Sequence, residues 1–261
     1  MIVPRVLTFR SLLLAAVTAT LLSGCAMNTT QAPATDMRGP DLSGQTPDQA
    51  QQTVAQLAAR YKANPHDKAT IIYYAAALRT AGQPEQAVAV VQQGVTAYPD
   101  DVDLKVNYAK ALAAAGSYTQ ALNVITDAIQ PDAPDWNALL VKGAVLDQMG
   151  QNDQARQTYS QALLIQPNEP SLEANLGLSY AMTNDLTQAE AHLRKAASLP
   201  GATSKIRQNL ALVIGLQGRF DEARKLLAAE LPPDQVEANM AYIKQMLTQQ
   251  NRWAAIKNAS Q

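Results

Sequence analysis

An alanine that follows Gln or Glu recurs in this chain every 34 residues, without insertion or deletion. The five alanines are Ala87, Ala121, Ala155, Ala189 and Ala223. A fixed period of this length over five copies indicates that each copy is one supersecondary unit stacked on the one before it. The spacing therefore predicts a repeat protein before any single residue is interpreted.

Within each 34-residue unit, small and large residues recur at positions that indicate two helices joined by a tight turn. Twelve residues before each alanine the chain has Ala or Gly, which lets two helix backbones approach closely. Five residues before it stands a residue that tolerates the left-handed conformation in which helices often end. These turn residues are Gly82, Gly116, Gly150, Asn184 and Gly218. The pattern predicts helix, turn and helix in every unit.

This arrangement resembles the tetratricopeptide repeat (TPR), a 34-residue helix–turn–helix unit that often ends in proline. Pro99 and Pro167 stand at that terminal position. The resemblance implies an all-α fold, a right-handed TPR superhelix (α-solenoid), with five repeats at residues 68–237. A solenoid needs a cap at each end, and we assign the caps to residues 48–67 and 238–261.

Two details complete the expected solenoid. The N-terminal cap is interpreted as half of a degenerate repeat, because Pro65 lies 34 residues before Pro99. At the other end, Asp234 is predicted to cap a helix that runs to about Gln250 and closes the stack.

The first 24 residues have the features of a signal peptide. Arg5 and Arg10 precede an apolar stretch that ends at Leu22 and is short for a bilayer core of about 30 Å. The stretch ends in Leu22-Ser-Gly-Cys25, which resembles the lipobox of bacterial lipoproteins, whose cysteine is acylated. Cys25 is the only cysteine. The alternative is an ordinary signal peptide followed by an unrelated free thiol.

The residues after the lipobox indicate where the folded part is located. Ala26 follows the cysteine, and a non-acidic residue there implies sorting to the outer membrane in lipoproteins of Gram-negative bacteria. Residues 25–47 contain few large apolar side chains and are predicted to form a disordered tether. We therefore expect a lipid anchor in the outer membrane and a folded domain in the periplasm.

Composition argues against two classes of function. The formal net charge is −1 and no basic stripe is present, so we expect no nucleic-acid binding. The two histidines are His66, predicted to lie in a turn, and His192, predicted to face solvent near Glu190. Neither belongs to a metal-ligand cluster, and the chain has no Gly-rich phosphate loop or nucleophile elbow. We expect no enzyme, no metal and no cofactor.

The TPR resemblance implies a binding surface on the concave side, which the first helices of successive repeats line. The candidate residues at those positions are Ile72, Val106, Asn107, Lys110, Leu140, Asn175, Leu178, Met182, Asn209 and Leu212. Most are aliphatic, which suits an apolar or amphipathic segment of another protein. In the alternative interpretation, the asparagines satisfy nearby backbone groups and some aliphatic residues belong to the core. A chaperone-type carboxylate clamp is not predicted, because only Lys110 comes near its pattern.

A second resemblance is more specific. The lipobox, the tether, the five repeats and the sequences at 209–220 and 231–243 are similar to the TadD family of the tight-adherence (Tad, or Flp) pilus machinery. Membership would imply a pilotin-like outer-membrane lipoprotein that helps to assemble or localise the secretin channel. The expected partner is then a secretin or another pilus-assembly component.

Two further functions stay open from the sequence. The protein could be a scaffold for another envelope assembly, such as outer-membrane protein insertion or peptidoglycan synthesis. A solute-binding or glycan-binding lipoprotein, or a hydrolase, is disfavoured, because tryptophan occurs only at 136 and 253 and no sugar-stacking cluster is visible.

Overall fold

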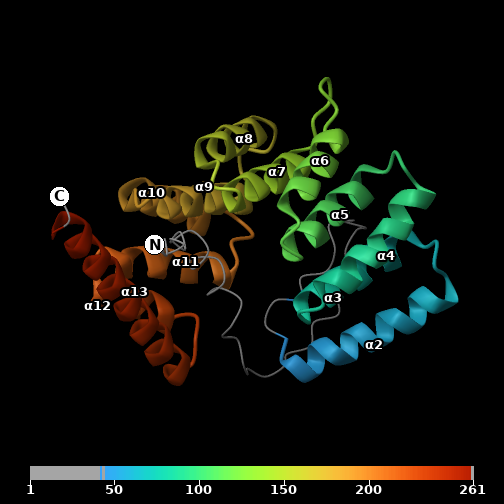
Figure 1. The fold of residues 1–261 in the computed structure, drawn as a ribbon. Helices are drawn as coiled ribbons and strands as arrows, with labels where there is room; N and C mark the ends of the chain where they lie inside the picture. The colour runs from blue at the N-terminus through green and yellow to red at the C-terminus, as the bar shows by residue number, and fades with distance from the viewer. Residues whose placement is uncertain (1–41, 43–44, 260–261) are drawn as a thin grey trace, which may run out of the picture. The chain divides into compact units, whose positions relative to one another are not determined.

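The computed structural model describes residue 42 and residues 45–259, so the signal peptide and Cys25 lie outside the described residues. All regular secondary structure in the described part is helical, as predicted (Figure 1). The helices are α2 (Pro47–Ala63), α3 (Lys68–Thr80), α4 (Pro84–Ala97), α5 (Val102–Ala114), α6 (Tyr118–Ala128), α7 (Trp136–Gln148), α8 (Asn152–Ile165), α9 (Pro170–Met182), α10 (Leu186–Ser198), α11 (Ser204–Leu216), α12 (Phe220–Ala228) and α13 (Pro233–Ala259). No helix among these residues is both long and apolar enough to cross a bilayer.

The five predicted turn residues all adopt positive φ, from 64° at Asn184 to 83° at Gly218. Each one ends the first helix of a repeat with the same hydrogen bond. In the first repeat the amide of Gln83 donates to the carbonyl of Leu78 at 2.8 Å, and the equivalent bonds recur at 34-residue intervals. This is the Schellman pattern, which satisfies carbonyls that the helix end leaves without partners. The turn prediction is confirmed.

Helix starts follow the same period. Asp67, Asp101 and Asp135 each accept a hydrogen bond from a backbone amide in the first turn of α3, α5 and α7. Glu169 and Thr203 occupy the equivalent positions at α9 and α11. A side-chain oxygen at this position satisfies an amide that has no partner within the helix. Every first helix of a repeat is therefore defined at both ends by local sequence.

The chain forms two compact units, which divide after Gln151. In the first unit, each helix from α2 to α7 packs on the next one along the chain. Its buried side chains form one cluster between α3, α4 and α5 and another between α5, α6 and α7. The α2 helix packs on the first cluster, where the rings of Tyr61 and Tyr74 lie 5.6 Å apart. A helix at residues 48–67 thus covers apolar side chains of the first repeat.

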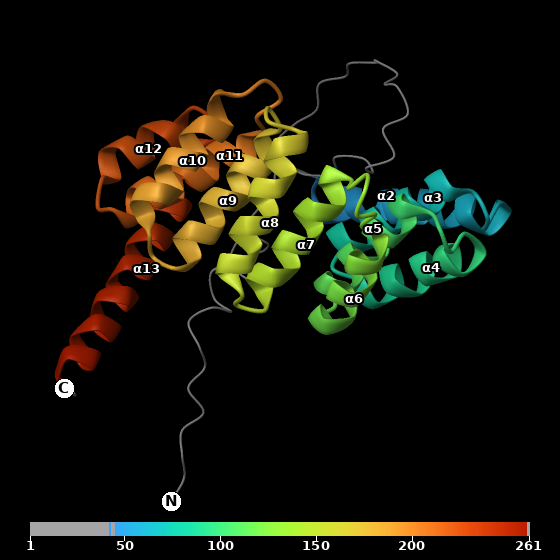
Figure 2. The same cartoon turned by 90° about the horizontal axis from the view of Figure 1, so that it is seen from above.

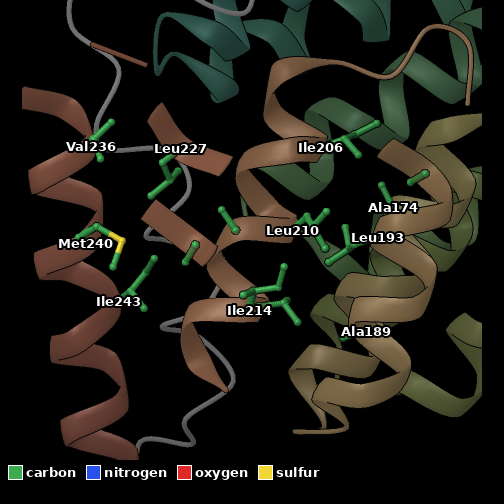
Figure 3. Close-up of a cluster of buried hydrophobic side chains, with 14 residues drawn as sticks. Ala174, Ala189, Leu193, Ile206, Leu210, Ile214, Leu227, Val236, Met240 and Ile243 are labelled. Carbon is green, nitrogen blue, oxygen red and sulfur yellow. The ribbon is translucent and has the colours of Figure 1, made fainter. Parts of the chain in front are cut away.

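In the second unit, each helix from α8 to α13 packs on the next one (Figure 2). One continuous apolar cluster joins α9 to α13 and includes Leu193, Ile214 and Met240 (Figure 3). The last helix begins at Pro233 and continues to Ala259, beyond the predicted end near Gln250. Its Val236, Met240 and Ile243 are buried against the cluster.

The small residues of the repeat lie where helices touch. All five repeat alanines have no exposed surface. A Cβ atom added to Gly177 would come within 2.9 Å of Leu193 Cγ and 3.0 Å of the Ala189 carbonyl oxygen, so this glycine lets α9 and α10 approach closely. A Cβ atom added to Gly215 would come within 2.6 Å of Ile243 Cγ2, so the contact between α11 and α13 also needs glycine. Packing density is thus encoded by small residues at fixed positions.

Glu190 on α10 is the centre of an ion-pair network in the second unit. Its carboxylate accepts hydrogen bonds from Arg219 Nη1 at 2.6 Å, Gln217 Nε2 at 2.8 Å and Arg194 Nε at 2.8 Å. Partial burial alone would raise the pKa of Glu190, but these hydrogen bonds outweigh it and lower the pKa to about 2. The network connects α10 to the turn between α11 and α12.

This shift predicts acid sensitivity. Because the folded-state pKa lies below the ordinary value of 4.5, Glu190 contributes stability above about pH 4.5, and the contribution is lost as the pH falls towards 2. The arginine partners are 41–45% exposed, so we expect Glu190→Gln to cost only about 1 kcal/mol at pH 7. Urea titrations between pH 7 and pH 2 should show a flatter pH dependence for this variant. Glu85→Gln, which changes an exposed glutamate, serves as the control, and equal pH profiles for the two variants would contradict the assignment.

Candidate protein-binding surface

The first helices of the repeats form one continuous side of each unit, which we call the inner face. In the first unit, α3 contacts α5 and α5 contacts α7. In the second unit, α9 contacts α11 and α11 contacts α13. The second helices of neighbouring repeats, α4 with α6 and α10 with α12, make no contact of similar extent. The first helices are therefore the closely spaced side of each stack, where solenoids present their binding surfaces.

Three of the predicted surface residues in the first unit lie inside the protein. Ile72 and Val106 have no exposed surface, and Asn107 is 1% exposed. Ile72 packs in the cluster between α3, α4 and α5, and Val106 packs in the next one. These positions are core in this structure, because the next repeat covers them, and they are not accessible to a partner.

The asparagines serve their own helices. Asn107 Nδ2 donates to the carbonyl of Asp103 at 2.9 Å, and Asn175 Nδ2 donates to the carbonyl of Ser171 at 2.7 Å. Both bonds join residues four apart on one helix, so these two amides follow the structural interpretation. Asn209 is 8% exposed. None of the three is therefore a strong candidate for bonding an extended peptide.

The accessible apolar part of the inner face lies in the second unit. Leu178 and Met182 stand one helical turn apart on α9, and Leu212 occupies the position of Leu178 one repeat later, on α11. All three side chains are partly exposed, and α9 and α11 are in contact. In the first unit, Leu140 and Lys110 are also partly exposed, and Lys110 Nζ donates to Asn137 Oδ1 at 3.4 Å.

The acidic pocket at the start of α5 and α7 has a structural explanation. Asp100, Asp101, Asp103 and Asp135 line it. Asp101 and Asp135 are helix caps, and Lys68 Nζ binds the Asp101 carboxylate at 2.6 Å. Burial, followed by the charges of Asp101 and Asp135, raises the pKa of Asp103. In the described part of the chain, no group of three or more His, Cys, Asp or Glu residues is arranged to hold a metal ion.

The predicted environment of His192 is wrong. Its ring is 25% exposed, and Nδ1 lies 2.8 Å from Oε2 of Glu173, not beside Glu190. Glu173 is 1% exposed and also binds Lys195 Nζ at 2.6 Å. The imidazole stacks on Tyr180, with ring centroids 5.4 Å apart. Because a buried carboxylate needs partners, this cluster holds α9 against α10.

A stacked series of helix–turn–helix units with an inner face defines a helical-repeat protein of the α-solenoid class. Two family models described as tetratricopeptide repeat match the chain. One matches residues 78–143 and 112–177, and the other matches 170–195 and 209–229. Together they span more than half of the 261 residues, and the chain belongs to the tetratricopeptide-repeat family.

Solved structures show the same fold. TTC0263, a TPR protein of Thermus thermophilus, matches with a TM-score of 0.56 and 20% identity over 75% of this chain and 99% of that chain. Human IFIT1, solved as a dimer with m7Gppp-AAAA, matches with a TM-score of 0.60 and 17% identity over 75% of this chain and 49% of that chain. Cut9, in the APC/C Cut9–Hcn1 hetero-tetramer, gives 0.59 and 17% over 76% and 40%. The chain thus spans less than half of the IFIT1 and Cut9 chains. A search of curated proteins found no significant match.

Proposed function

We propose that this protein is an outer-membrane-anchored periplasmic interaction module that acts as a pilotin-like assembly factor for a Tad/Flp pilus secretin. The observation that supports binding most directly is the inner face of the second unit, where Leu178, Met182 and Leu212 are partly exposed. TPR proteins are typically non-enzymatic scaffolds, and their inner faces bind protein partners. An apolar or amphipathic segment of a partner would cover these side chains.

The proposed location rests on the sequence alone. The lipobox at residues 22–25 and the non-acidic Ala26 favour a lipid anchor in the outer membrane. Several acyl chains at about 0.8 kcal/mol per buried methylene would hold the domain far more firmly than one myristoyl group. The pilus assignment rests on the similarity to the TadD family at residues 209–220 and 231–243.

Cys25→Ser tests the anchor. We expect the variant to leave the outer-membrane fraction and to appear as a folded soluble protein, because no acyl chain can be attached to serine. Fractionation of native cells followed by immunoblotting measures the distribution, and circular dichroism of the purified chain measures helix content.

A second variant separates the outer membrane from membranes in general. Ala26→Asp keeps the lipid and places an acidic residue directly after the cysteine, so we expect the protein to remain in the inner membrane. If Cys25→Ser still fractionates with the outer membrane, the lipid-anchor proposal is wrong. If Ala26→Asp does not move the protein, the sorting argument fails even though the anchor stands.

A further inference from the structure

Arg79 on α3 is a buried cation without an anionic partner. Its Nε atom is inaccessible and has no hydrogen-bond partner, while the residue as a whole is only partly exposed. Within residues 45–259, no hydrogen bond or ion pair of the Arg79 side chain is formed. It occupies one of the TPR positions that face the inner side, one turn after Ala76.

The other arginines of the structure behave differently. Arg156, Arg194, Arg207, Arg219 and Arg224 each form an ion pair with a carboxylate. Arginine stays charged in proteins, so removing its hydration without supplying an acceptor is unfavourable. Desolvation lowers the pKa of Arg79, and no neighbouring carboxylate opposes that effect. The location of Arg79 in the last turn of α3 offsets part of this cost, because helix C-termini favour cations.

A second unsatisfied group lies on the next inner helix. Oδ1 of Asn107 on α5 is buried without a hydrogen-bond partner, and α5 contacts α3. Lys110 follows three residues later on α5, on the same side of that helix. The inner face of the first unit therefore combines two cationic side chains with polar atoms that the chain itself leaves unpaired.

We propose that Arg79 receives a carboxylate from an acidic segment of a partner protein that lies along the inner face of the first unit. The guanidinium fork matches a carboxylate through two parallel hydrogen bonds. A phosphate fits less well, because its second charge would face the carbonyl end of α3. The proposal rests on the proposed function and adds the partner's chemistry: acidic at the first unit and apolar at the second.

Binding of a defined acidic peptide tests this assignment. The full mature chain with Cys25→Ser, which removes only the lipid, is titrated with acetylated and amidated hexaglutamate, and the Arg79 Nε–Hε resonance is followed by NMR. We expect a saturable shift. Hexaglutamine and inorganic phosphate should produce none.

Two variants locate the effect. Arg79→Gln should weaken hexaglutamate binding by about tenfold or more, the loss expected for a charge-assisted hydrogen-bonded pair. Arg60→Gln is the matched control, because Arg60 lies in the last turn of α2, in the same unit, and is exposed. Its affinity should stay within about twofold. Equal affinity for wild type and Arg79→Gln would overturn the proposal, and so would equal binding of phosphate.

The stability of the free protein gives an independent readout. Arg79→Met removes an uncompensated charge and keeps an apolar stem, so we expect the melting temperature to rise by about 2–4 °C. A fall in melting temperature would show that the guanidinium is a structural group and would overturn the proposal. An Arg79 resonance that is already shifted in the peptide-free chain and lost on changing Asp36 or Asp41 to Asn would assign the site to the chain's own tether instead. These outcomes are separate from the proposed function, which fails only if anchoring or capture at the second unit fails.

Discussion

Ile214→Ala is expected to lower the free energy of unfolding by about 2–5 kcal/mol. Ile214 on α11 has no exposed surface, and it lies in the cluster to which α9, α10, α12 and α13 also contribute (Figure 3). Truncation removes apolar contacts and leaves a cavity, because helices fixed by glycine contacts on two sides have little freedom to close it. Gly177 and Gly215 are those contacts.

Urea denaturation followed by circular dichroism measures this effect. Ile165→Ala is the matched control, because Ile165 at the end of α8 is 41% exposed, and we expect a change of at most about 0.5 kcal/mol. A loss below about 1 kcal/mol for Ile214→Ala would contradict the close packing of this cluster.

The repeat architecture could be predicted from sequence because its signals are local and periodic. Only Gly or Asn fits easily at positive φ, so five such residues at one interval identify five turns. The helix caps at residues 67, 101, 135, 169 and 203 follow the same interval, and this signal was available in the sequence. The length of α13 was underestimated, because the sequence after Gln250 has no strong helix-stop residue.

The binding surface was harder to predict, because a helix position defines a direction and not what covers it. Ile72 and Val106 have the right positions, but the neighbouring repeat buries them. Arg79 was noted among the inner positions, yet its isolation depends on where every carboxylate of the unit lies. The partners of His192 follow from the approach of α9 and α10, which brings together residues 19 apart in sequence.

The double variant Leu178→Glu/Leu212→Glu is expected to abolish partner binding. Covering one leucine contributes about 1.5–3 kcal/mol, so losing two would weaken binding by roughly two to four orders of magnitude. Both side chains are partly exposed in the free protein, so the glutamates can reach solvent and helix content should not change. Leu164→Glu is the control, because Leu164 at the end of α8 is 87% exposed and does not belong to the inner face.

The most direct measurement is crosslinked capture from native cells. The lipid-anchored wild type, Leu164→Glu and the double variant are each crosslinked and purified, and bound proteins are identified by mass spectrometry. We predict that the wild type and Leu164→Glu recover a secretin or another pilus component and that the double variant does not. Recovery of insertion machinery or cell-wall synthases would contradict the pilus assignment. Undiminished capture by the double variant would contradict the inner face as the binding surface.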